Sequence, residues 1–151
     1  MTPELAAALR ALSQEEIELG RERLEAIVAA TPGDADAWAY LSGVLLASAD
    51  IEGATAASEQ ALALAPDGFA PRIKAGELAL RLGNLEGAEQ WFVAALRAVE
   101  PGTPAALAAK RALVITRTKR RSAIGHDALL PRLRLSLTWR RRTDITTEGA
   151  R

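Results

Sequence analysis

Apolar residues recur three or four positions apart through most of the chain, with polar residues between them, which is the spacing of one face of a helix. The spacing predicts helices over residues 35–48, 51–64, 69–82 and 85–99. Two more are expected within residues 3–30, the first capped by Thr2 with Pro3 at its first position and the second opened by a capping box of Ser13 and Glu16. A seventh helix is expected from Pro104 to about residue 122, so the chain is predicted to be all-α.

The central part of the chain repeats itself at a fixed interval. Pro66 follows Pro32, and Gly87 follows Gly53, at the same offset of 34 positions. A period of this length is typical of helix-turn-helix units that stack into a solenoid and bury one another's apolar faces. We interpret residues 1–34 as a degenerate first unit and residues 103–122 as a capping helix. The expected architecture is a short right-handed α-α superhelix of about three helix pairs.

The pattern changes near the C-terminus. Residues 124–127 are expected to break the last helix, and apolar residues then alternate with polar ones over residues 133–140. Such alternation is typical of a half-buried strand. The chain is therefore divided into a helical repeat domain, residues 1–122, and an extended basic C-terminal arm, residues 123–151. The candidate contact residues of the arm are Arg132, Leu133, Arg134, Leu135, Leu137, Trp139 and Arg140.

The repeated units resemble tetratricopeptide repeats, whose first helix carries a Trp-x-x-Leu-Gly-x-x-Tyr pattern and whose second helix carries small residues, a Phe and a final Pro. The matching residues are Trp38, Leu41, Ala54, Ala61 and Pro66 in one unit and Gly76, Ala88, Phe92 and Ala95 in the next. Arg72 departs from the pattern, because it stands where a Trp is expected.

The resemblance implies that the first helices line a concave groove that binds an extended or helical segment of another protein. By the family's pattern, the groove residues would be Asp36, Ala39, Gly43, Leu46, Ala70, Ile73, Glu77 and Leu80. These side chains are small, apolar or acidic, so an apolar or basic segment is expected as ligand, and not a free C-terminal carboxylate.

The net charge of zero hides an uneven distribution of charge. Residues 1–116 carry 9 Lys and Arg against 16 Asp and Glu, a balance of −7, whereas residues 117–151 carry 10 against 3, a balance of +7. Such a split indicates an interaction segment. The basic end is expected to dock on a partner protein, to pack on the acidic body, or to contact nucleic acid or an anionic membrane surface.

No set of residues points to catalysis or metal binding. The chain has no Cys, and His126, its single histidine, has no neighbouring ligand residues in the sequence. No apolar run reaches the roughly 20 residues needed to span a bilayer, and the N-terminus lacks the basic start of a signal peptide, so a cytoplasmic protein is expected.

We therefore predict a non-enzymatic adaptor or accessory subunit of a larger assembly, without cofactor or metal, that binds a protein partner through the groove and the arm. Self-association is left open. The alternative is a nucleic-acid-associated repeat protein that holds phosphates through residues 117–142.

Overall fold

The computed structural model describes the backbone of residues 1–143 and the side chains of residues 1–123. Within this range the chain forms α-helices and no strand, which confirms the all-α prediction. The helices are α1 (Pro3–Ser13), α2 (Ile17–Ala30), α3 (Ala35–Ala47), α4 (Ile51–Leu64), α5 (Phe69–Arg81), α6 (Leu85–Arg97) and α7 (Pro104–Thr143). The predicted bounds of the four central helices are correct to within two residues.

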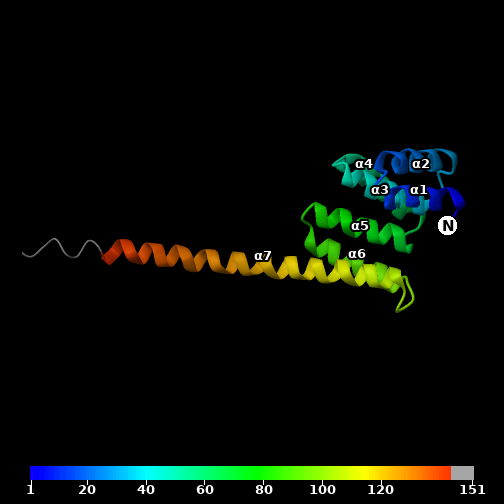
Figure 1. Ribbon diagram of the computed structural model, residues 1–151. Coiled ribbons are helices and arrows are strands. Elements are labelled where there is room, and N and C mark those ends of the chain that lie inside the picture. The colour runs from blue at the N-terminus through cyan, green and yellow to red at the C-terminus, as the bar shows by residue number, and fades with distance from the viewer. Residues whose placement is uncertain (144–151) are drawn as a thin grey trace, which may run out of the picture.

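The helices form three pairs, α1 with α2, α3 with α4 and α5 with α6, which stack one after another (Figure 1). Between pairs, α2 packs on α3 and α3 packs on α5, while α7 packs on α6 and closes the stack. The arrangement is the solenoid that the period of the sequence predicts.

A residue with left-handed backbone geometry separates the two helices of every pair. Its φ angle is 63° at Glu15, 62° at Ala49 and 78° at Gly83. These three positions are separated by one sequence period each, and the second helix of each pair begins two residues later. Because the turn recurs at the same interval, the N-terminal pair is a true member of the repeat, as its interpretation as a degenerate first unit requires.

The predicted capping box at the start of α2 is wrong. Ser13 is the last residue of α1, and its Oγ donates to the carbonyl oxygen of Arg10 at 2.8 Å. Glu16 takes the cap position, as Asp50 does for α4, but makes no side-chain cap bond. The repeat geometry places the turn at Glu15, and Ser13 therefore lies three residues too early to cap α2. The Thr2 cap of α1 is confirmed by a 3.2 Å bond from the amide of Leu5.

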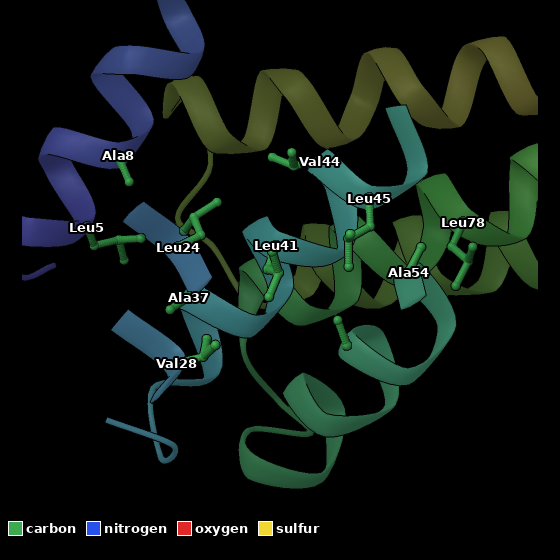
Figure 2. Close-up of a cluster of buried hydrophobic side chains, with 11 residues drawn as sticks. Leu5, Ala8, Leu24, Val28, Ala37, Leu41, Val44, Leu45, Ala54 and Leu78 are labelled. Carbon is green, nitrogen blue, oxygen red and sulfur yellow. The ribbon is translucent and has the colours of Figure 1, made fainter. Parts of the chain in front are cut away.

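Two main groups of buried apolar side chains hold the stack together. One runs from Leu5 and Ala8 of α1, through Leu24 and Leu41, to Leu78 of α5 (Figure 2). The other surrounds Phe92 and joins α5, α6 and α7. Because the first group draws on all three pairs and the second joins the third pair to α7, no pair is buried without its neighbours.

Arg72 replaces the Trp of the repeat pattern without losing its role. Trp38 donates its indole N–H to the carbonyl oxygen of Pro32 at 2.9 Å, and Arg72 donates its Nε–H to the carbonyl oxygen of Pro66 at the same distance. The Arg72 guanidinium also donates to the carbonyl oxygen of Ala94, at 3.2 Å, and to the Asp67 carboxylate. The two positions are thus equivalent, although one side chain is aromatic and the other is charged.

The predicted helix break at residues 124–127 and the predicted strand over residues 133–140 are both wrong. The backbone of α7 continues through them to Thr143, and Figure 1 shows its C-terminal half projecting beyond α6. A single strand needs a neighbouring strand for its backbone hydrogen bonds, whereas a helix satisfies them internally, and Leu and Arg are good helix formers. The side chains of the seven arm residues, and the whole of residues 144–151, lie outside the described residues.

Candidate functional site

The first helices of two successive pairs, α3 and α5, surround an open hollow of about 460 Å³ together with α7. Its walls bring together four of the eight predicted groove residues, Gly43 and Leu46 from α3 and Glu77 and Leu80 from α5. Ala47, Arg81 and Lys119 complete the lining. We call this hollow the α3–α5–α7 groove.

A small polar network extends along the same faces of α3 and α5. Lys74 Nζ donates a hydrogen bond to Glu77 Oε2 at 2.8 Å. The same Nζ lies 5.8 Å from the ring centroid of Tyr40. That distance is within the range of a cation–π contact. A Cβ at Gly43 would lie 3.3 Å from the Lys74 side chain, so the glycine leaves room for the lysine stem.

Tyr40 is half-buried beside this network. Burial raises the pKa of its phenol, and the nearby carboxylates of Asp36 and Glu77 raise it further. The phenol is therefore neutral at physiological pH and can donate a hydrogen bond. Tyr40 was not among the predicted groove residues, although the repeat could have identified it, because it lies one period before Lys74, on the neighbouring first helix.

The other four predicted groove residues lie outside the lining of the hollow. Ala39, Ala70 and Ile73 are buried, with exposed fractions of 0%, 5% and 8%, and belong to the packed core. Asp36 is exposed near the start of α3. Lys119 was missed as a lining residue, because the sequence indicated only a basic end to the last helix and not which way it faces.

A second and larger hollow lies between α1 and α2, near the turn into α3. Its volume is about 770 Å³. We call it the α1–α2 cleft. It was not predicted from the sequence. Its lining residues are Thr2, Glu4, Ala7, Arg23, Ala26, Ile27, Ala30, Thr31 and Asp34.

Ion pairs hold α7 to α6. Glu89 accepts from Arg117 Nε at 2.8 Å through Oε1 and from Arg120 Nη1 at 2.9 Å through Oε2. These hydrogen bonds, Arg117 first and Arg120 second, lower the pKa of the Glu89 carboxyl below its ordinary value of 4.5. Two of the arginines that open the basic end of the chain are thus engaged by the protein itself.

Within the part of the chain that the structure describes, no three His, Cys, Asp or Glu side chains gather closely enough to hold a metal ion. None of the described helices combines the length and the apolar character needed to cross a membrane.

Neither a family model nor a curated protein matches the chain. Solved structures do. The chain is similar to the Sgt2 tetratricopeptide-repeat domain from Aspergillus fumigatus, with 20% identity and a TM-score of 0.66 over 81% of this chain and 82% of that one. It is also similar to PcrH in complex with the chaperone binding region of PopD, with 18% identity and a TM-score of 0.62 over 78% and 90%.

A third similar structure is the first tetratricopeptide repeat of Spaghetti (RPAP3) bound to the HSP90 peptide SRMEEVD, with 14% identity and a TM-score of 0.63 over 78% of this chain and 90% of that one. At these identities the likeness establishes the fold. The protein has the fold of a tetratricopeptide-repeat domain, as the resemblance in the sequence implied.

Proposed function

We propose that this protein binds other proteins, as an adaptor or accessory subunit of a larger cytoplasmic assembly, and has no catalysis of its own. The α3–α5–α7 groove carries this proposal, because it is an open hollow between α7 and the first helices of two successive pairs, and Leu46 and Leu80 form part of its walls. PcrH and RPAP3, which share the fold, were solved with segments of other proteins bound.

The groove suits an apolar segment of a partner. Leu46 and Leu80 are only partly buried, so a partner side chain placed between them would remove further apolar surface from water. Arg81 and Lys119 line the same hollow, and an acidic residue of the partner would lie favourably beside them. The sequence predicted an apolar or a basic segment as the ligand of the groove, and of these two the lining residues favour the apolar segment.

The basic arm supports the same function as a second contact. Two linked contacts bind more tightly than either alone, because the first raises the effective concentration of the second. Nucleic-acid binding through residues 117–142 is the less favoured alternative, since Arg117 and Arg120 are held by Glu89. A steep loss of affinity for generic RNA or DNA with rising salt would favour that alternative.

Substitution in the groove tests the proposal. A partner is first identified by affinity purification with the full chain, and its affinity for purified variants is then measured by calorimetry. Leu46→Arg and Leu80→Glu are expected to lower the affinity at least tenfold without unfolding the protein. Leu64→Arg is the matched control, because Leu64 is 40% exposed at the end of α4, outside the groove. Equal affinities for all three variants would place the binding surface elsewhere.

A further inference from the structure

The α1–α2 cleft corresponds to a place that large side chains fill in the other two pairs. In the third pair Arg72 reaches from α5 to the carbonyl oxygen of Ala94 on α6. In the second pair Trp38 of α3 packs against a buried cluster that includes Ala61 of α4. The residue one period before Trp38 is Glu4, on the wall of the cleft.

The opposite wall shows the same correspondence. Ala26 lies two periods before Ala94, and Ile27 lies one period before Ala61. Both line the α1–α2 cleft. By its position in the repeat, the cleft thus corresponds to the space that Trp38 and Arg72 occupy, and the residue at their position is the shorter Glu4.

The lining of the cleft offers the same kinds of group that surround Arg72, although its carboxylates stand at other positions of the repeat. Arg72 is 17% exposed, and its guanidinium donates to carbonyl oxygens and to the Asp67 carboxylate. The cleft offers the methyl groups of its alanines to an apolar stem and the carboxylates of Glu4 and Asp34 to a cation. Arg23, the cation in the lining, already donates Nη1–H to the carbonyl oxygen of Ala7 at 2.9 Å.

We propose that the α1–α2 cleft binds an arginine side chain from a basic segment of a partner protein. The stem would lie along Ala7, Ala26 and Ala30, and the guanidinium would meet Glu4 or Asp34 and the Ala26 carbonyl, as Arg72 meets Asp67 and the Ala94 carbonyl. The net charge of −7 on residues 1–116 favours the approach of such a segment. Arginine is preferred to lysine because its planar fork can donate to a carbonyl and a carboxylate together. The inference extends the proposed function but uses a separate surface.

Glu4→Trp tests whether the α1–α2 cleft is equivalent to the spaces that Trp38 and Arg72 fill in the other two pairs. A tryptophan there would fill the first cleft as Trp38 fills the second, and is expected to raise the thermal midpoint by about 2–4 °C. Glu22→Trp is the control, because it removes the same charge from the exposed face of α2 and is expected to leave the midpoint unchanged. A Glu4→Trp variant no more stable than the control would overturn the equivalence.

Binding is tested with a defined probe that needs no partner. N-acetylarginine methylamide is titrated into the isotope-labelled full chain, and amide shifts are followed by NMR. Saturable shifts are expected at Ala26, Ala30 and Asp34, with at least threefold weaker binding of the lysine analogue and none in Glu4→Trp. Equal binding of both analogues would mean simple charge attraction and would overturn the proposal.

The source of the arginine is tested by sedimentation. A full chain that stays monomeric with rising concentration supports a foreign partner, whereas self-association abolished by Glu4→Trp would assign the cleft to a second copy and overturn the proposed source. Since Leu46→Arg leaves the cleft intact, that variant is expected to bind the arginine probe normally. A failure in the groove can thus be told from a failure in the cleft.

Discussion

Ala49 adopts a backbone conformation that L-residues with a Cβ rarely use. Its φ of 62° costs the folded state about 1–2 kcal/mol. A glycine would avoid this strain, but its greater flexibility in the unfolded chain would offset about 0.5–1 kcal/mol of the gain. Ala49→Gly is therefore expected to raise the free energy of unfolding by about 0.5–1 kcal/mol, measured by urea denaturation. The reverse change, Gly83→Ala, at the equivalent turn with φ of 78°, should lower it by a similar amount. A less stable Ala49→Gly variant would contradict this reasoning.

Gly76 of α5 lies directly against the ring of Phe92 on α6. A Cβ added there would lie 2.4 Å from Cε1 of Phe92, which is fully buried. Gly76→Ala is expected to destabilise the protein by about 1–3 kcal/mol, the usual cost of overpacking a core. The double variant with Phe92→Leu should lose less than the sum of the two single changes, because the smaller side chain makes room for the methyl group. Additive losses would show that the two residues do not compete for this space.

Side-chain chemistry at single positions was the hardest feature to predict. The period placed Trp38 and Arg72 at equivalent positions, but pattern reasoning treated Arg72 as a departure. The two side chains share one function because both carry an N–H at a similar reach, and each donates it to a carbonyl in the turn before its helix. A pattern of apolar and polar positions does not reveal that two different side chains make the same hydrogen bond. For the same reason the α1–α2 cleft was not predicted, since it depends on the side chain that Glu4 places at the position of Trp38 and Arg72.

At the scale of elements, the attachment of α7 to α6 is expected to depend on pH. Glu89 has a lowered pKa in the folded protein, so the folded state binds fewer protons than the unfolded state near and below pH 4.5. The stability that its ion pairs supply is present above that pH and is lost as the pH falls through the lowered pKa. Glu89→Gln lacks this contribution, and its difference in stability from the unsubstituted protein should shrink on acidification.

Chemical denaturation at pH 7 and at steps down to pH 3 measures this difference. The pairs are partly exposed, with Glu89 20% and Arg117 50% accessible, so 1 M salt at pH 7 should also reduce it. Glu59→Gln, on the exposed face of α4, is the control. A pH-independent difference between Glu89→Gln and the unsubstituted protein would indicate that the carboxylate acts through packing and not through charge.

The helices of the solenoid were predictable because their apolar spacing and turn residues agree. Asp50 and Asn84 cap α4 and α6 by accepting from the amides of Gly53 and Gly87 at 2.9 Å, as their position in the repeat suggests. The C-terminal segment was mispredicted because alternation over eight residues is compatible with either secondary structure when helix formers supply it. The deciding factor was the lack of a strand partner among residues 1–143, which a local pattern does not reveal.

For the whole molecule, the projecting half of α7 is expected to contribute little to the stability of the solenoid. Figure 1 shows this part of α7 extending past α6, while the buried residues of α7 among those described, Ala106, Ala109, Leu113 and Thr116, all precede it. Removal of residues 124–151 is therefore expected to leave the thermal midpoint of the solenoid within about 2 °C of the full chain. A large fall in that midpoint would instead assign the segment to the fold.

The same truncation tests whether the arm contributes to binding. If the groove and the arm hold one partner together, the loss of the arm removes the advantage of effective concentration, and affinity should fall by about 10²–10⁴-fold. When Leu46→Arg is added to the truncated protein, both contacts are disrupted, and only weak residual binding is expected. An affinity unchanged by truncation would show that the arm makes no contact with this partner. Arg117 and Arg120 would keep a structural role in that case, because both pair with Glu89.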